Sequence, residues 1–85
     1  SIAAGSYSQN TILTLKLKNK TVKEIFTIIE EKSEYVFFYY EGGVDDKRKI
    51  DLDVQGEAVD KILDKIFEGT NNTYIIDDRQ IYSSV

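Results

Sequence analysis

The apolar residues of the first half of the chain recur in the second half at a constant separation of 37 residues. Ten pairs obey this offset: Leu13 and Ile50, Leu15 and Leu52, Leu17 and Val54, Val22 and Val59, Ile25 and Ile62, Phe26 and Leu63, Ile29 and Ile66, Phe37 and Tyr74, Phe38 and Ile75, and Tyr39 and Ile76. Self-similarity at a fixed period indicates a repeated structural unit. We therefore predict two copies of one unit, with the shared positions in the core.

The first unit is predicted to be a strand, a helix and a second strand. Residues 11–18 alternate between apolar and polar side chains, which is typical of a strand with one buried face. Thr21 and Glu24 have the spacing of a capping box that starts a helix. An apolar stripe follows at helical spacing, and Ile28 lies off this stripe, which suggests a second packing contact. Residues 35–40 are apolar or aromatic throughout, which predicts a strand covered on both faces.

The second unit repeats this order and adds a strand. Residues 48–54 alternate again, and a second helix is expected after a break at Gln55 and Gly56. Gly69 stands where a left-handed cap would end that helix. Residues 73–76 and 80–83 flank a short turn and form a plausible hairpin. The predicted class is α+β, with two β-α-β repeats side by side plus a final strand; the order β-α-β-β-α-β also matches the ferredoxin-like plan.

The composition excludes several kinds of chemistry. A chain of 85 residues is sized for one domain. It has no Cys and no His, which rules out a disulfide, a Cys or His zinc site and a Ser-His or Cys-His nucleophile pair. The net charge of −4 is opposite to the basic surface that a phosphate backbone or anionic lipid requires. No apolar run approaches the roughly 18 residues of a membrane span. We therefore predict neither nucleic-acid binding nor membrane insertion by this domain.

The acidic residues are concentrated in the second half. Residues 41–85 contain six Lys and Arg against eleven Asp and Glu, a balance of −5. A calcium loop needs oxygen ligands at regular spacing and a closing acidic residue, and this pattern is absent around Asp45, Asp46, Asp51 and Asp53. We therefore interpret these four residues as solvated surface. No metal site, no cofactor and no enzymatic activity are predicted.

The aromatic run at residues 35–40 has three interpretations. Core packing is the first, and protein contact through Tyr side chains is the second. The third is base stacking by a ferredoxin-like RNA or small-ligand binder. The third strand argues against RNA, because Asp51 and Asp53 stand where phosphates would lie.

Residues 1–10 are small, polar and without periodicity. They are interpreted as a disordered leader or the remnant of a secretory signal peptide, so the predicted domain covers residues 11–85.

Five segments together resemble the STN domain, the short domain found at the N terminus of secretins and TonB-dependent proteins. They are LTLKLKNKTVKEIF (13–26), YVFFY (35–39), IDLDV (50–54), VDKILDKIFEGT (59–70) and TYII (73–76). In particular, they resemble the version that heads SusC-like TonB-dependent outer-membrane transporters. The resemblance implies two helices packed between a two-stranded and a three-stranded sheet. It also implies a periplasmic location ahead of a plug and an outer-membrane barrel, and contact with the periplasmic region of an anti-sigma factor.

The resemblance supplies no ligand motif, so the contact residues are a physical hypothesis. A partner strand could pair with an exposed sheet edge, and nearby Tyr and charged residues would then set specificity. The candidate partner-binding residues are Tyr40, Asp77, Asp78, Arg79 and Tyr82. The alternatives that keep the fold are an STN-type domain of a secretin, with a role in assembly, or of the anti-sigma partner itself.

Overall fold

The computed structural model describes residues 11–85, so the prediction for residues 1–10 lies outside the described part. The elements in chain order are β1 (Ile12–Thr21), α2 (Val22–Lys32), β2 (Val36–Phe38), β3 (Lys49–Ala58), α3 (Val59–Ile66), β4 (Thr73–Asp77) and β5 (Gln80–Ser84). Neither helix in this range has the length and hydropathy that would let it cross a bilayer.

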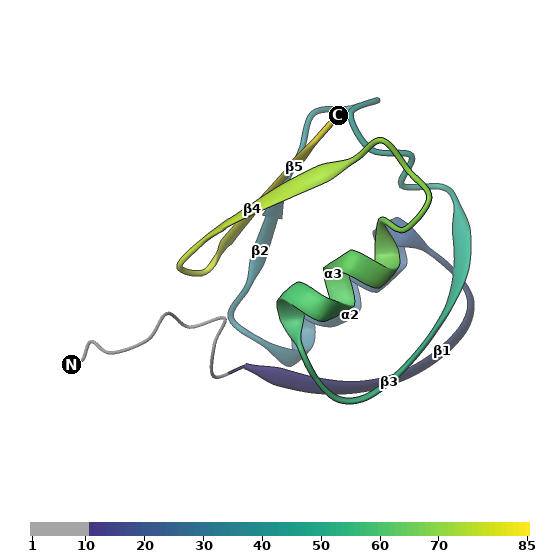
Figure 1. Ribbon diagram of the computed structural model, residues 1–85, viewed down its shortest axis with the longest axis vertical. Coiled ribbons are helices and arrows are strands. Elements are labelled where there is room, and N and C mark those ends of the chain that lie inside the picture. Colours follow the sequence, from purple (N-terminus) through teal and green to yellow (C-terminus); the bar gives the residue numbers. More distant parts are fainter. Residues whose placement is uncertain (1–10) are drawn as a thin grey trace.

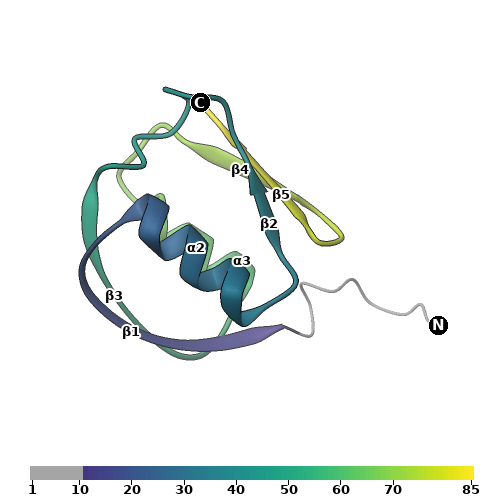
Figure 2. The same ribbon diagram turned by 180° about the vertical axis from the view of Figure 1, so that it is seen from behind.

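The strands form two separate sheets. β1 pairs antiparallel with β3, and the second sheet has the order β2-β5-β4, with β2 parallel and β4 antiparallel to β5. Both helices lie in the space between the sheets (Figures 1 and 2). The predicted α+β class is confirmed, and each repeat contributes one strand to each sheet. The ferredoxin-like alternative is wrong, because its four strands would form a single sheet.

The repeat is clearest in the helices, where equivalent positions are buried alike. Three offset pairs are fully buried: Val22 and Val59, Ile25 and Ile62, and Ile29 and Ile66. In both helices this stripe faces the common core. Ile28 is half-buried and packs against the same core. The offset therefore reflects two helices that bury the same face.

The two helices begin differently. The Thr21 hydroxyl accepts a hydrogen bond from the Glu24 N–H, and a Glu24 carboxylate oxygen accepts one from the Thr21 N–H, which confirms the capping box. These hydrogen bonds lower the pKa of Glu24. Helix α3 has Ala58 at its N-cap and no side-chain cap. Gly69, with φ +76°, lies in the turn after α3.

The expected break at Gln55 and Gly56 is wrong, because β3 continues to Ala58. Gly56 adopts φ +58°, and its N–H donates to the Thr14 hydroxyl of β1 at 2.9 Å. The β1–β3 register shifts in this region, so the glycine permits an irregularity within a continuing strand. β1 likewise passes Lys18 and ends at Thr21, with Asn19 at φ +54° donating its N–H to Asp51.

The expected strand at residues 35–40 is shorter and is covered on one face only. β2 contains Val36–Phe38, and its inward side chain, Phe37, stacks on Phe26 of α2 at a centroid distance of 3.9 Å. Val36 and Phe38 are 45% and 46% exposed on the opposite face. A continuous apolar run was interpreted as two covered faces, whereas here one face packs on the helices and the other meets solvent.

Candidate interaction surface

The outer face of the three-stranded sheet carries apolar side chains at its centre. Phe38 of β2 stands opposite Tyr82 of β5, and Tyr82 stands opposite Ile75 of β4. The Phe38 and Tyr82 rings stack with centroids 5.3 Å apart and planes inclined by 20°. Phe38 and Tyr82 are each 46% exposed and Ile75 is 69% exposed. We call these three residues the outer row, and it crosses the whole sheet.

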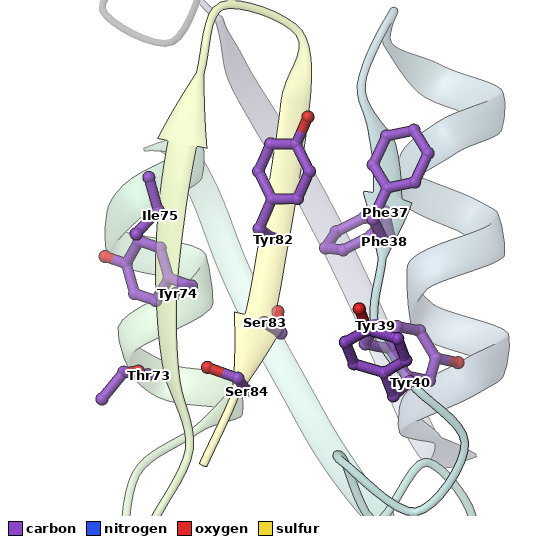
Figure 3. Close-up of a pocket in the computed structure, with 10 residues that line it drawn as sticks. All are labelled: Phe37, Phe38, Tyr39, Tyr40, Thr73, Tyr74, Ile75, Tyr82, Ser83 and Ser84. Carbon is purple, nitrogen blue, oxygen red and sulfur yellow. The ribbon is translucent and has the colours of Figure 1, made fainter.

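A depression of about 560 Å³ surrounds the outer row. Its lining comes from all three strands and from the segment after β2 (Figure 3). The lining residues are Phe37, Phe38, Tyr39, Tyr40, Thr73, Tyr74, Ile75, Tyr82, Ser83 and Ser84. No carboxylate or cationic side chain lines it, so the depression suits an apolar or aromatic contact and offers no acid-base pair.

Two tyrosines at the margins of the sheet anchor it to acidic residues. The Tyr39 hydroxyl donates to Asp46 at 2.8 Å, and the Tyr74 hydroxyl donates to Asp64 at 2.7 Å. Burial, followed by the hydrogen bond to Asp46, raises the pKa of Tyr39 to about 12. Burial and the hydrogen bond to Asp64 raise the pKa of Tyr74 as well. Both hydroxyls therefore stay protonated at neutral pH, and their hydrogen bonds attach the sheet to Asp46 and Asp64.

We expect the domain to lose stability in alkaline solution through Tyr39. Its pKa is about 12 in the folded state, against 10.0 for a free tyrosine, so the unfolded state loses this proton first. The protonated Tyr39 hydroxyl makes its full contribution to the free energy of unfolding below about pH 10. This contribution is lost as the pH rises from about 10 to about 12. Urea unfolding at about pH 9 and about pH 11 should show a smaller loss for Tyr39→Phe than for the wild type. An equal loss in both proteins would contradict this assignment.

The five candidate contact residues fall into two groups. Tyr40, 88% exposed, and Tyr82 both line the depression. Asp77 ends β4, whereas Asp78 and Arg79 form the tip of the hairpin. Tyr82 lies on the central strand of its sheet and not at an edge.

The charges of the hairpin tip are engaged locally. Arg79 Nε lies 2.9 Å from a Glu34 carboxylate oxygen, and its Nη1 lies 2.9 Å from Asp78. Exposed ion pairs of this kind add little to stability, because water and salt screen them. They raise the pKa of Arg79, mainly through the hydrogen bond to Glu34. The tip therefore presents paired charges, while Asp77 is left exposed beside them.

Sequence reasoning did not place Val36, Phe38 and Ile75 among the contact residues. Phe38 and Ile75 form one of the ten offset pairs, and the interpretation of this pair as core is wrong. Both occupy outward positions on the two edge strands, on either side of Tyr82. A pair of large apolar residues separated by the repeat length can therefore mark a shared surface as well as a shared core.

Two of the acidic residues that the sequence singled out make hydrogen bonds within the domain. Within residues 11–85, no group of three or more His, Cys, Asp and Glu side chains is arranged to hold a metal ion. Asp46 accepts a hydrogen bond from the Tyr39 hydroxyl, and Asp51 accepts one from the Asn19 backbone N–H. Asp51 and Asp53 are exposed on β3, as expected for the solvated face of a strand.

One comparison with known proteins identifies the family. The model of the Secretin and TonB N terminus short domain matches residues 35–82, from the start of the β2 region into β5. The match covers more than half of the chain and leaves out β1 and α2. A comparison with curated protein sequences found no match. The chain belongs to the STN family, whose members are non-catalytic interaction domains of secretins and of TonB-dependent receptor N termini.

Proposed function

We propose that this chain is the periplasmic N-terminal signalling domain of a SusC-like TonB-dependent outer-membrane transporter. In this role it is continuous with a plug and a barrel on the periplasmic side of the outer membrane. It relays substrate occupancy by contacting the periplasmic domain of an anti-sigma factor. The domain itself performs no catalysis and inserts into no membrane.

The outer row is the observation that carries this proposal. In a domain with a net charge of −4, two aromatic rings and an isoleucine lie together at the centre of an exposed sheet face. Contiguous exposed apolar area of this kind marks contact sites, and Tyr is enriched at the centres of protein interfaces. A purely structural domain would gain solubility from polar side chains at these positions.

The side chains that line the depression carry no formal charge. Aromatic, aliphatic and hydroxyl side chains line it, which fits a protein surface better than a charged small molecule. The acidic residues of the second half give it a net charge of −5, which would favour a basic partner. Protein contact therefore explains the outer row and the uncharged lining of the depression.

Calorimetric titration with the periplasmic domain of an anti-sigma factor encoded beside the same gene tests the proposal. We expect saturable one-to-one binding with a negative heat-capacity change, because apolar area is buried. Absence of binding at high concentrations of both proteins would remove the signalling role. The sequence that continues after residue 85 tests the transporter context, since a plug and many alternating strands of about 10 residues indicate a barrel. A secretin core in that position would support the assembly role instead.

A further inference from the structure

The free edge of β4 offers unpaired backbone groups. Asp77 and Gln80 close a two-residue turn and stand opposite each other, so they form a mutually hydrogen-bonded pair. Hydrogen-bonded pairs alternate along an antiparallel ladder, which makes Ile75–Tyr82 the next such pair. Tyr74 and Ile76 consequently direct their N–H and C=O groups away from β5. Within the described residues 11–85, no hydrogen bond satisfies these four groups.

The opposite edge of the sheet is closed by a side chain. The Val36 N–H donates to the Arg79 carbonyl of the adjoining turn, so the next residue, Phe37, points its N–H to the outer edge of β2. That N–H donates to a Glu30 carboxylate oxygen of α2 at 2.9 Å. A partner strand at β2 would have to displace this charge-assisted hydrogen bond. The two edges of the sheet are therefore unequal, and β4 is the accessible one.

A groove that contains one carboxylate, that of Asp64, runs beside the open edge. Asp64 and Phe67 of the α3 region and Thr73 and Tyr74 of β4 line a depression of about 310 Å³. The Tyr74 hydroxyl in this groove contacts both the Asp64 carboxylate and the Asp60 carbonyl. Burial raises the pKa of Tyr74, and the nearby Asp64 and Asp60 carboxylates raise it further.

We infer that β4 accepts an extended segment of the partner protein as a fourth strand, in which apolar residues alternate with Lys or Arg. This inference rests on the proposed function and adds the edge, the backbone conformation and the charge pattern of the partner. An added strand would satisfy the outward groups of Tyr74 and Ile76. Its apolar side chains would extend the outer row beyond Ile75, because side chains alternate between the two faces of a sheet.

The same alternation places the other side chains of the added strand on the inner face. There they meet the groove that contains Asp64, where a cation is favoured and a carboxylate is repelled. The net charge of −5 over residues 41–85 favours the same sign of partner. Strand pairing supplies affinity that is independent of sequence, and the charge of the inward positions supplies selection.

Synthetic peptides test this inference without the natural partner. Three capped peptides of about seven residues, the length of a short strand, are titrated into the ¹⁵N-labelled chain. One alternates Val and Lys, one has the same composition in two blocks, and one alternates Val and Glu. We expect the alternating Val-Lys peptide to bind at least about tenfold more tightly than either control at low salt. This difference in affinity should become smaller as salt is added. The Tyr74 and Ile76 amides should gain protection from hydrogen exchange.

A matched pair of variants locates the edge. Ile75→Lys and Val36→Lys each place a cation at an outward, exposed position of an edge strand in the same sheet. We expect Ile75→Lys to weaken binding of the Val-Lys peptide by about tenfold or more, because it repels the peptide and blocks the edge, and Val36→Lys to leave it unchanged. Protection centred on Phe37, equal effects of the two variants, or no binding of the Val-Lys peptide would overturn the inference. Binding of the anti-sigma domain with unaltered exchange at Tyr74 and Ile76 would overturn it while leaving the proposed function intact.

Discussion

Replacing Phe26 with alanine should cost the domain about 3–5 kcal/mol of unfolding free energy. A chain of this length has a total stability of about 4–13 kcal/mol, so the variant should lose a large share of it. Phe26 is 3% exposed and belongs to α2. Its ring stacks on Phe37 and meets the edges of Tyr39 and Phe67, so one side chain joins α2 to β2 and to the end of α3.

Phe38 provides the matched control for Phe26. Both are phenylalanines in contact with another aromatic ring. Phe38, however, is 46% exposed on the outer face, and among residues 11–85 it stacks on Tyr82 alone. Phe38→Ala should cost about 1 kcal/mol or less, the usual value of a cross-strand pair. Urea unfolding followed by circular dichroism measures both variants. Equal losses would mean that the outer row is part of the core and not a contact surface.

Replacing Tyr82 with alanine should weaken binding of the anti-sigma domain by about thirtyfold or more, with a stability loss of about 1 kcal/mol or less. Tyr82 is the centre of the outer row and lies on the central strand, so it is flanked by Phe38 and Ile75 on both sides. Residues of this type at the centre of an interface, surrounded by others that exclude water, dominate binding energies.

Ile12 is the control for a general loss of exposed apolar area. It is 61% exposed on β1, in the other sheet, and Ile12→Ala should leave binding unchanged. Calorimetry with the same anti-sigma domain compares the two variants, and unfolding curves verify that both remain folded. Equal affinities of Tyr82→Ala and wild type would place the contact elsewhere on the domain.

The parts of the fold that sequence predicted were those in which periodicity and burial coincide. The stripe that begins at Val22 and its copy that begins at Val59 are buried as expected, because a helix between two sheets must bury a face. The capping box at Thr21 was also predictable, since it depends only on two residues three positions apart. Local chemistry of this kind needs no knowledge of the rest of the chain.

The errors occurred where tertiary context overrides local preference. Gly56 resembles a strand terminator, yet a hydrogen bond to Thr14 of another strand holds it within β3. The pairing of the strands depends on tertiary contacts that cannot be read from the pattern of a single sequence. The central position of β5, in place of β4, was therefore not predictable. The contact residues were predicted least well. Phe38 and Ile75 are as apolar as core residues, and only the sheet register shows that they face outward.

The two sheets differ in what they present to solvent. On β3 the outward positions include Asp51 and Asp53, whereas the outward positions of the three-stranded sheet include the outer row. The repeat therefore duplicates the buried scaffold, and the surfaces built on it have diverged. This difference is the physical basis for assigning contact to one sheet.

A chemical-shift map of the ¹⁵N-labelled domain titrated with the anti-sigma periplasmic domain tests this assignment most directly. We expect the largest amide changes on β2, β5 and β4, including Phe38, Tyr82 and Ile75, while the amides of β1 and β3 stay unchanged. Changes centred on β1 and β3, or no change at saturating concentrations of the partner, would contradict it.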